Sequence, residues 1–216
     1  MRIIPITESK QLSSAPTSFI YLASQSPRRS QLLDQIGIAH QILVADATED
    51  AESLEIALTN EAPLAYVTRV TALKLDAAVA RMKLRGLPLA PVLCADTTVA
   101  KGRILYGKPE SEQDAARMLA ELSGSTHRVL TSVAVAYGPQ GKKRLQAVSE
   151  SKVTFARLSK AQIASYIATG EPMGKAGSYA VQGRAATFIE KISGSYSGIM
   201  GLPMFETAQL LAKLGF

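Results

Sequence analysis

The amino-acid sequence predicts an α/β protein. Short apolar runs typical of strands alternate along the chain with longer stretches whose apolar residues recur at helical spacing. No segment repeats, which is consistent with that architecture. Hydrophobic residues make up 47% of the 216 residues and charged residues 19%, proportions typical of a globular protein with a sizeable core. We therefore expect one large domain or two closely packed lobes.

The composition also limits the kinds of site and partner. A net charge of +6 favours anionic partners. The single cysteine, Cys94, excludes an intrachain disulfide framework and indicates a reducing compartment. With two histidines, His40 and His127, we expect any metal to be held mainly by oxygen atoms. No apolar run is long enough to span a membrane, and residues 1–16 lack the apolar core of a signal peptide, so we expect a short N-terminal extension.

The first strand-like run, residues 19–23, leads directly into a predicted helix. Ser26 is a typical N-cap and Pro27 fits the first turn, where its missing N–H costs nothing. The free N–H groups at such a helix start attract anions. Arg28 and Arg29 add two positive charges at the positive end of the helix dipole, which is unfavourable unless an anion joins them. The alternative is that both arginines are ordinary solvated surface residues.

The next segments contain an acidic loop and a lysine among apolar residues. After a helix over 28–36 and a strand over 40–44, the carboxylates of residues 46–52 indicate a loop, because they are too polar for a core. The longest helical pattern, residues 63–85, predicts a buried face of six residues: Tyr66, Val70, Leu73, Ala77, Ala80 and Leu84. Lys74 falls within that apolar sector. Its ammonium must therefore either reach water past the core or meet an anion.

A single carboxylate interrupts the most apolar predicted strand. The run Pro91–Ala100 has strand formers on both sides of Asp96, whereas aspartate is depleted in strands. A residue that breaks an otherwise consistent pattern often marks a functional site, and open α/β sheets carry their sites at strand ends. We expect a functional role for Asp96; the alternative is a structural hydrogen-bonding role.

The second half of the chain is expected to alternate strands and helices. Predicted strands cover residues 129–137, 151–155 and 188–192, and predicted helices cover residues 112–122, 159–168 and 204–214. We expect the turn at 138–141 and the basic residues 142–144 to form a solvated hairpin tip, because no aromatic residues are interleaved there to stack nucleobases. Residues 171–183, rich in glycine, would let the backbone approach a ligand or would form a tight crossing. Residues 193–203 indicate a turn-rich loop.

Together these features favour hydrolysis of a phosphate ester or anhydride. The chain offers cations on separate elements, a strand carboxylate and an acidic loop, but neither a Walker-type loop nor a Rossmann glycine fingerprint. Cations and a divalent metal ion stabilise charge on phosphorus, while a carboxylate orients or deprotonates water.

Six short motifs occur in order between Phe19 and the C-terminus. They are Ser24-x-Ser26-Pro27-Arg28-Arg29-x-x-Leu32-Leu33, Ala95-Asp96-Thr97, Gly107-Lys108-Pro109, Leu122-Ser123-Gly124-x-Thr126-His127, Glu171-Pro172-Met173-x-Lys175-Ala176-Gly177 and Gly201-Leu202-Pro203. Each is weak alone, but their combination and spacing resemble the Maf family of nucleoside triphosphate pyrophosphatases.

The resemblance implies a fold, an activity and a set of site residues. It implies a mixed, twisted sheet with flanking helices, in which two lobes of a single domain, residues 17–216, enclose a cleft as in the inosine triphosphate pyrophosphatases. It implies a cytoplasmic homodimer that hydrolyses a nucleoside triphosphate to its monophosphate and pyrophosphate with Mg²⁺ or Mn²⁺. Asp96 matches the family's proposed general base and is expected near the metal, and Glu49 matches an acidic position linked to metal or water. The residues expected around the triphosphate are Ser24, Ser26, Arg28, Arg29, Lys74, Lys108 and Lys175.

Three positions resemble the family members that prefer dTTP and UTP. Those members have arginine, threonine and glutamine where this chain has Arg28, Thr97 and Gln182, whereas a sister group acting on 7-methylguanosine triphosphate typically has tryptophan, glutamine and glutamate. The Gln182 amide offers a donor and an acceptor that match the O4 and N3–H of uracil or thymine. The chain departs from the family pattern at Gly174, usually aspartate, and at Cys94, usually glycine.

Two other functions stay open. The family name derives from an effect on bacterial septum formation, and a basic chain with a nucleotide-sized cleft would also suit a regulator that binds nucleotide or nucleic acid without hydrolysing it. Asp96 argues against that role, because binding a polyanion gains nothing from a carboxylate inside the site. A purine-selective hydrolase of the same fold is disfavoured by Gln182.

Overall fold

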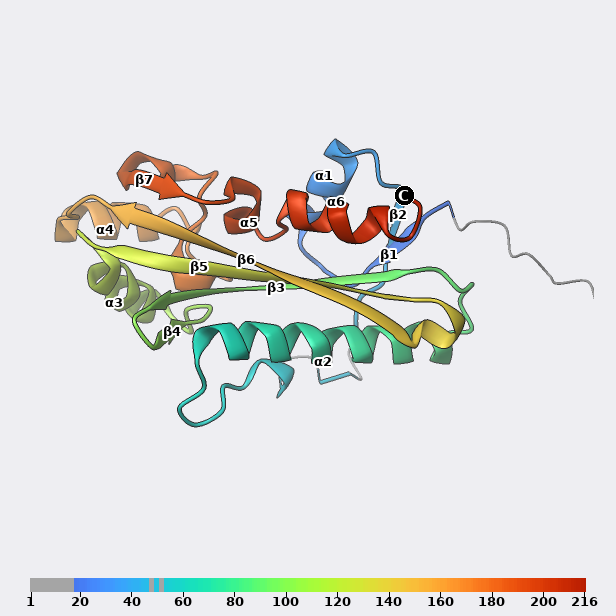
Figure 1. Ribbon diagram of the computed structural model, residues 1–216. Helices are drawn as coiled ribbons and strands as arrows, with labels where there is room; N and C mark the ends of the chain where they lie inside the picture. Colours follow the sequence, from blue (N-terminus) through green and yellow to red (C-terminus); the bar gives the residue numbers. More distant parts are fainter. Residues whose placement is uncertain (1–17, 47–48, 51–52) are drawn as a thin grey trace, which may run out of the picture.

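A mixed β-sheet forms the centre of the molecule (Figure 1). The computed structural model describes residues 18–46, 49–50 and 53–216, so the predicted extension over residues 1–16 lies outside the described part of the chain. Within that part, seven strands pair in the order β2-β1-β3-β5-β6-β7, and β4 pairs with β3. The strands are β1 (Ile20–Leu22), β2 (His40–Ile42), β3 (Val92–Lys101), β4 (Ile104–Tyr106), β5 (Thr126–Tyr137), β6 (Lys143–Phe155) and β7 (Ile189–Ser193). Strand β1 runs parallel to β2 and β3, and the other pairs are antiparallel, which confirms the mixed α/β fold.

Helices cover both faces of the sheet. They are α1 (Pro27–Gln35), α2 (Pro63–Leu84), α3 (Glu112–Leu122), α4 (Lys160–Ile167), α5 (Tyr196–Met200) and α6 (Met204–Ala212). In Figure 1, α2 runs beneath the long strands, α1 and α6 lie above them, and α3 and α4 lie together at one end. None of the described helices is both long and apolar enough to cross a lipid bilayer.

Strand β3 sends alternate side chains into two separate cores. Leu93 and Ala95 pack in the cluster that α1 and α6 cover, whereas Val92 and Cys94 pack in the cluster that α2 covers. This follows from the period of two along a strand. Asp96 continues the second series, so its side chain faces α2.

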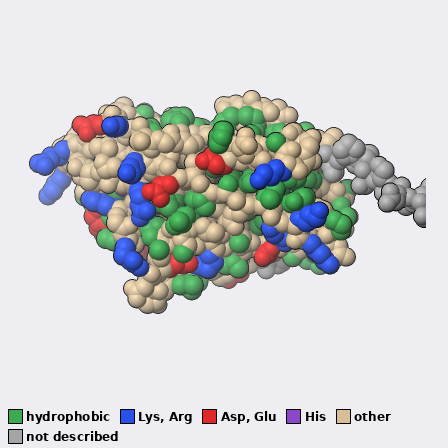
Figure 2. All heavy atoms as spheres, in the orientation of Figure 1, with side chains coloured by type: hydrophobic (Ala, Val, Ile, Leu, Met, Phe, Trp, Pro, Cys, Tyr) green, Lys and Arg blue, Asp and Glu red, His purple; other side chains and the backbone are tan. Residues whose placement is uncertain are grey.

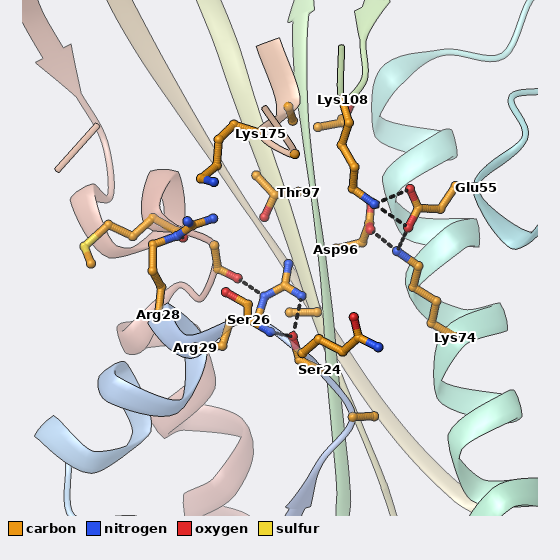
Figure 3. A pocket seen from close by; sticks show the side chains of 18 of the residues that line it. Ser24, Ser26, Arg28, Arg29, Glu55, Lys74, Asp96, Thr97, Lys108 and Lys175 are labelled. Atoms are coloured by element: carbon orange, nitrogen blue, oxygen red, sulfur yellow. Dashed lines mark hydrogen bonds and ion pairs between the residues drawn. The ribbon is translucent and has the colours of Figure 1, made fainter. Parts of the chain in front are cut away.

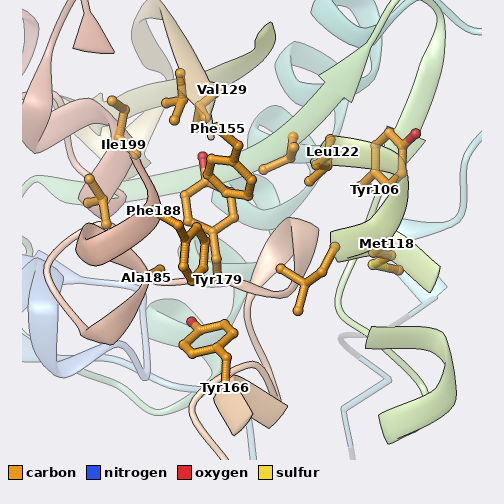
Figure 4. Close-up of a cluster of buried hydrophobic side chains, with 14 of the residues drawn as sticks. Tyr106, Met118, Leu122, Val129, Phe155, Tyr166, Tyr179, Ala185, Phe188 and Ile199 are labelled. Carbon is orange, nitrogen blue, oxygen red and sulfur yellow. The ribbon is translucent and has the colours of Figure 1, made fainter. Parts of the chain in front are cut away.

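A third core, rich in aromatic rings, fills the end of the sheet near α3 and α4 (Figure 4). The rings of His127, Phe155 and Tyr179 meet edge to face, with centroids 4.8 to 5.4 Å apart. Such contacts each contribute about 0.5–1.5 kcal/mol beyond the area that they bury. The Nε2 atom of His127 lies 2.8 Å from the Tyr179 hydroxyl. Burial, with a smaller effect of Lys101, lowers the pKa of His127 to about 4.

Local capping signals explain where α3 and α4 begin. The Ser111 hydroxyl accepts a hydrogen bond from the Asp114 N–H at the start of α3, and Ser159 and Gln162 form a capping box at the start of α4. Ser26 occupies the N-cap of α1 as predicted, but its side chain makes no capping hydrogen bond.

The predicted boundaries were wrong at three elements. Strand β4 lies in a segment for which no strand was predicted, and helix α5 lies in the predicted turn-rich loop; both are too short to give a periodic signal. Strand β6 begins at Lys143 rather than at residue 151, so Lys143 and Arg144 pair with β5 instead of forming the hairpin tip. Its first half was missed because that half is only partly buried and therefore polar.

The predicted buried face of α2 was partly wrong, although Val70 is fully buried as predicted. Leu73 and Leu84 are exposed, whereas Val67, Leu75 and Met82 are fully buried. The true face contains Thr71, whose hydroxyl donates to the Val67 carbonyl one turn earlier at 2.7 Å. A threonine whose hydroxyl is hydrogen-bonded in this way can lie in a core. Because threonine is polar, the sequence pattern did not assign Thr71 to the buried face.

Candidate functional site

The cleft opens where one edge of β3 has no neighbouring strand. Strand β1 pairs with β3 only at Val92 and Leu93, and β4 pairs with it only from Val99 onward. Between these points, residues 94–98 pair with β5 on one side, and no described strand pairs with them on the other. Beyond its last residue, β1 gives way to the loop that begins α1. The resulting cavity has a volume of about 580 Å³ and is lined by Asp96 among others, a size that suits a small-molecule ligand.

Two sets of polar side chains line this cavity, one on each face of the sheet, and neighbouring residues of β3 contribute to both. Asp96 faces α2, where it meets Lys74, and Thr97 faces the opposite way, towards Arg29 of α1. Figure 3 shows the side chains of both groups pointing into the same space. The residues of the predicted triphosphate site that line the cavity are Ser24, Ser26, Arg28, Arg29, Lys74, Lys108 and Lys175.

In the first group, which lies on the face covered by α2, carboxylates and ammonium groups alternate along a chain of hydrogen bonds. Lys74 Nζ donates to Asp96 Oδ1 at 2.5 Å and to Glu55 Oε1 at 2.7 Å, and Lys108 Nζ donates to Glu55 Oε2 at 3.1 Å. Burial alone would lower the pKa of Lys74, but Asp96 and Glu55 outweigh it and raise that pKa. Of the two alternatives for Lys74, the structure therefore confirms the one in which its ammonium meets an anion.

Glu55 is a site residue that the sequence did not reveal. It ends a short 3₁₀ helix, Ser53–Glu55, in a segment rich in carboxylates, and nothing in the local pattern separates it from its neighbours. Burial would raise the pKa of the Glu55 carboxyl, but Lys74 and Lys108 hold it below its usual range. The Tyr66 hydroxyl donates to the Glu55 carbonyl at 2.9 Å and so fixes the backbone there.

The second group consists of the two arginines of α1 and the serine before them. Arg29 donates to the Gly201 carbonyl at 2.7 Å and to Ser24 Oγ at 3.1 Å, and Arg28 donates to the Met200 carbonyl at 3.1 Å. Burial, followed by the charge of Arg29, lowers the pKa of Arg28. The arginines are thus partly buried and held towards the cleft, which argues against the solvated-surface alternative.

Lys175 approaches the cleft from the glycine-rich segment. Burial and then the charge of Arg28 lower the pKa of Lys175, while Glu171 opposes them. Two positive side chains that raise each other's energy in this way would gain from an anion between them. The Gly177 N–H donates to the Gly107 carbonyl at 3.0 Å, which ties this segment to the one that carries Lys108.

Two predicted site residues do not line the cavity. Glu49 is bound by Arg81 through Nε and Nη2, each 2.7 Å from a carboxylate oxygen, and this contact lowers the Glu49 pKa. Gln182 is exposed beside Val181, which does line the cavity. Arg28 and Thr97, the other residues linked to base preference, line it, and the Thr97 hydroxyl lies 2.9 Å from that of Thr131.

The cleft offers few ligands for a metal ion. In residues 18–46, 49–50 and 53–216, no three His, Cys, Asp or Glu side chains are grouped so that they could hold one. Asp96 and Glu55 line the cavity, and the Lys74 ammonium bonds to both. Because Mg²⁺ usually binds through one or two carboxylates together with substrate phosphates, this pair suits an ion that phosphate oxygens also ligate.

Known proteins resemble this chain over almost its whole length. The family described as Maf-like protein matches residues 19–214. The chain is 66% identical over 200 residues to a dTTP/UTP pyrophosphatase of Albidiferax ferrireducens, covering 93% of this chain and 98% of that protein. It is 61% identical over 197 residues to a dTTP/UTP pyrophosphatase of a Polaromonas species, covering 91% and 96%. Among solved structures, a HAM1 protein from Coxiella burnetii is 11% identical with a TM-score of 0.49, covering 90% of this chain and 98% of that one.

Proposed function

This chain belongs to the Maf family, and from that premise we propose that its cleft hydrolyses nucleoside triphosphates, dTTP and UTP in particular, to the monophosphate and pyrophosphate. One observation carries the proposal: a carboxylate, Asp96, only 8% exposed, lies in a cleft that six cationic side chains also line. Cations from separate segments suit the charge of a triphosphate. A carboxylate among them weakens binding of a polyanion, so its presence favours a role in chemistry on the bound triphosphate over binding alone.

In the proposed reaction, Asp96 orients a water molecule and accepts its proton. The water oxygen bonds to the α-phosphorus, the bond from that phosphorus to the bridging oxygen breaks, and pyrophosphate leaves with the bonding electrons. Lys74 holds Asp96 in place through the 2.5 Å hydrogen bond. A base positioned in this way typically contributes about 10²- to 10⁴-fold in rate.

The remaining cations are proposed to bind the three phosphates. Arg28, Arg29 and Lys175 form one wall, and Lys108 reaches in from the other. Ser24 Oγ already accepts hydrogen bonds from Arg29 and from the Ser26 N–H, so its own proton is free to be donated to a phosphate oxygen. These groups stabilise the negative charge that develops on the leaving pyrophosphate.

A divalent cation, Mg²⁺ or Mn²⁺, is proposed to be held by Asp96 and Glu55 together with phosphate oxygens. When bound, such an ion neutralises phosphate charge and helps to orient the water. We place Glu55 in the role predicted for Glu49, because Glu55 lines the cavity and Glu49 is engaged by Arg81.

Base preference is proposed to depend on Arg28, Thr97 and Gln182. The first two line the cavity; Gln182 does not line it but follows Val181, which does. The Gln182 amide offers a donor and an acceptor that match a pyrimidine. We further propose that residues 17–216 act as one domain of two lobes, that the protein works as a homodimer in the cytoplasm, and that nucleic acid is not its ligand. On the face shown in Figure 2, basic side chains are interspersed with acidic and apolar ones and form no continuous stripe.

The proposal is tested by pyrophosphate release from a panel of nucleoside triphosphates with Mg²⁺. We expect release from dTTP and UTP, and a loss of at least about 10²-fold in kcat for Asp96→Asn with the melting temperature preserved. Tight nucleotide binding without pyrophosphate release from any member of the panel would instead favour a regulator that only binds. Unchanged turnover in Asp96→Asn would remove that residue from the mechanism.

A further inference from the structure

The Glu171 carboxylate joins the two ends of the glycine-rich segment, residues 171–183, that carries Lys175. Its Oε1 accepts a hydrogen bond from the Tyr166 hydroxyl at 2.8 Å, and its Oε2 accepts one from the Arg184 N–H at 2.9 Å. The Ala185 N–H adds a longer contact to Oε1 at 3.4 Å. A side chain at the start of the segment thus holds the backbone at its end, thirteen residues later in the chain.

The segment fits tightly around this carboxylate. At Gly183 a Cβ atom would overlap the Glu171 carboxylate, so the backbone comes closer than any other residue would allow. The Tyr166 hydroxyl is also shared, since the Ala180 N–H donates to it at 3.3 Å. Burial, then the hydrogen bond and charge of Glu171, raise the Tyr166 pKa, so the phenol stays protonated and keeps donating.

The same segment is fixed to the cleft at its middle. The Gly177 N–H donates to the Gly107 carbonyl, next to Lys108, and Gly177 itself lies against Val99 of β3. Glu171 therefore joins the two ends of the segment, and the middle of the segment contacts β3. Within the segment, Lys175 lies close enough to Arg28 for their charges to interact.

We propose that Glu171 is a positioning residue for the triphosphate site, holding residues 172–183 so that Lys175 stays in the cleft across from Arg28. This role of Glu171 rests on the proposed function, which identifies the ligand as a triphosphate. The carboxylate suits this task because two oxygens accept hydrogen bonds from donors on two elements at once. Glutamine offers one acceptor oxygen, so it must turn an N–H₂ group towards one of these donors.

The test is a double-mutant cycle on the binding of inorganic tripolyphosphate, measured by calorimetry. We expect Glu171→Gln to weaken binding about 5- to 10-fold, Lys175→Met to weaken it about as much, and Glu171→Gln to change it less than 2-fold once Lys175 is methionine. Glu190→Gln, which changes an exposed carboxylate of β7, is the matched control and should bind as the wild type does.

Two results would overturn the inference. One is an effect of Glu171→Gln that is as large with methionine at position 175 as with lysine, because the side chain would then act on the fold and not through Lys175. The other is wild-type binding by Glu171→Gln together with unchanged hydrogen exchange over residues 172–183. Binding of tripolyphosphate does not require hydrolysis of nucleotides. A wild-type protein that binds tripolyphosphate but releases no pyrophosphate from dTTP would therefore contradict the proposed function and leave the inference about Glu171 intact.

Discussion

At the scale of single residues, the chemistry of the cleft depends on which carboxylates lie beside its lysine and arginine side chains. Asp96 and Glu55 are joined through Lys74, whereas Glu49 belongs to a separate pair with Arg81, whose side chain is 7% exposed. The two glutamates are six positions apart in one acidic stretch, yet their surroundings give them different tasks. We propose that Glu55 acts on the ligand, whereas Glu49 pairs with a buried guanidinium.

Substituting each glutamate by glutamine separates these tasks. We expect Glu55→Gln to lower kcat/KM for dTTP by at least about 10-fold, because the negative charge between the Lys74 and Lys108 ammonium groups is lost. We expect Glu49→Gln to leave kcat/KM within about 2-fold but to lower the free energy of unfolding by about 2 kcal/mol, since Arg81 loses charged hydrogen bonds. Steady-state kinetics and urea unfolding check both; the reverse pattern would return Glu49 to the metal role.

His127 gives a pH dependence to stability. Its pKa is lowered from 6.5 to about 4 in the folded protein, so the unfolded chain binds a proton at a higher pH than the native protein does. The stability contributed by the neutral ring is complete above about pH 6.5 and is lost as the pH falls towards 4, by about 1.4 kcal/mol per unit and about 3 kcal/mol in total.

Urea unfolding of the wild type and of His127→Gln at pH 7 and pH 4.5 measures this term, because the other titrating groups cancel in the difference. The wild type should lose about 2 kcal/mol more than the variant on acidification. An equal loss in both proteins would show that the ring does not stay neutral in the folded state.

At the scale of elements, two neighbouring glycines show what the glycine-rich segment requires. Gly174 and Gly177 have φ angles of +71° and +67°, which alanine adopts only at a cost of about 1 kcal/mol. A Cβ atom at Gly174 would meet nothing within 4 Å, whereas one at Gly177 would lie 2.9 Å from both Val99 methyl groups. The pair therefore separates backbone strain from loss of the contact with β3.

We expect Gly174→Ala to lower the free energy of unfolding by about 1 kcal/mol with little change in KM. Gly177→Ala should cost about 1–3 kcal/mol more and should raise KM for dTTP, because the segment with Lys175 must move away from β3. Equal effects of the two substitutions on both quantities would mean that the contact with Val99 does not position the segment.

The elements also show how far the sequence predicts the molecule. Asp96, Arg28 and Arg29 were recognisable because each breaks a local rule of its strand or helix. Glu55 broke none, since one carboxylate in an acidic stretch looks like the next, and only the contacts with Lys74 and Lys108 distinguish it. The buried face of α2 was missed because Thr71 satisfies its hydroxyl inside the helix, which composition cannot reveal.

At the scale of the whole molecule, the site exists because the sheet is incomplete on one side. Strand β1 leaves β3 after Leu22, and β4 joins it only at Val99, so the intervening residues of β3 border the cavity. The sequence predicted the long strand and its carboxylate, but not this gap, which depends on the register of β1 and on β4. Long-range pairing of this kind leaves no local trace in a single sequence.

The gap also explains why the charges converge. Helix α2 lies on one face of the sheet and α1 on the other, and only an opening at the edge of β3 lets residues of both faces reach the same ligand. We therefore propose that a triphosphate lies in this opening, with Asp96 beside its α-phosphorus.

Hydrolysis of dTTP in water enriched in oxygen-18, with mass analysis of both products, tests this placement most directly. Attack of an Asp96-oriented water on the α-phosphorus predicts one labelled oxygen in dTMP and none in pyrophosphate. Label in the pyrophosphate, or release of orthophosphate in its place, would contradict it.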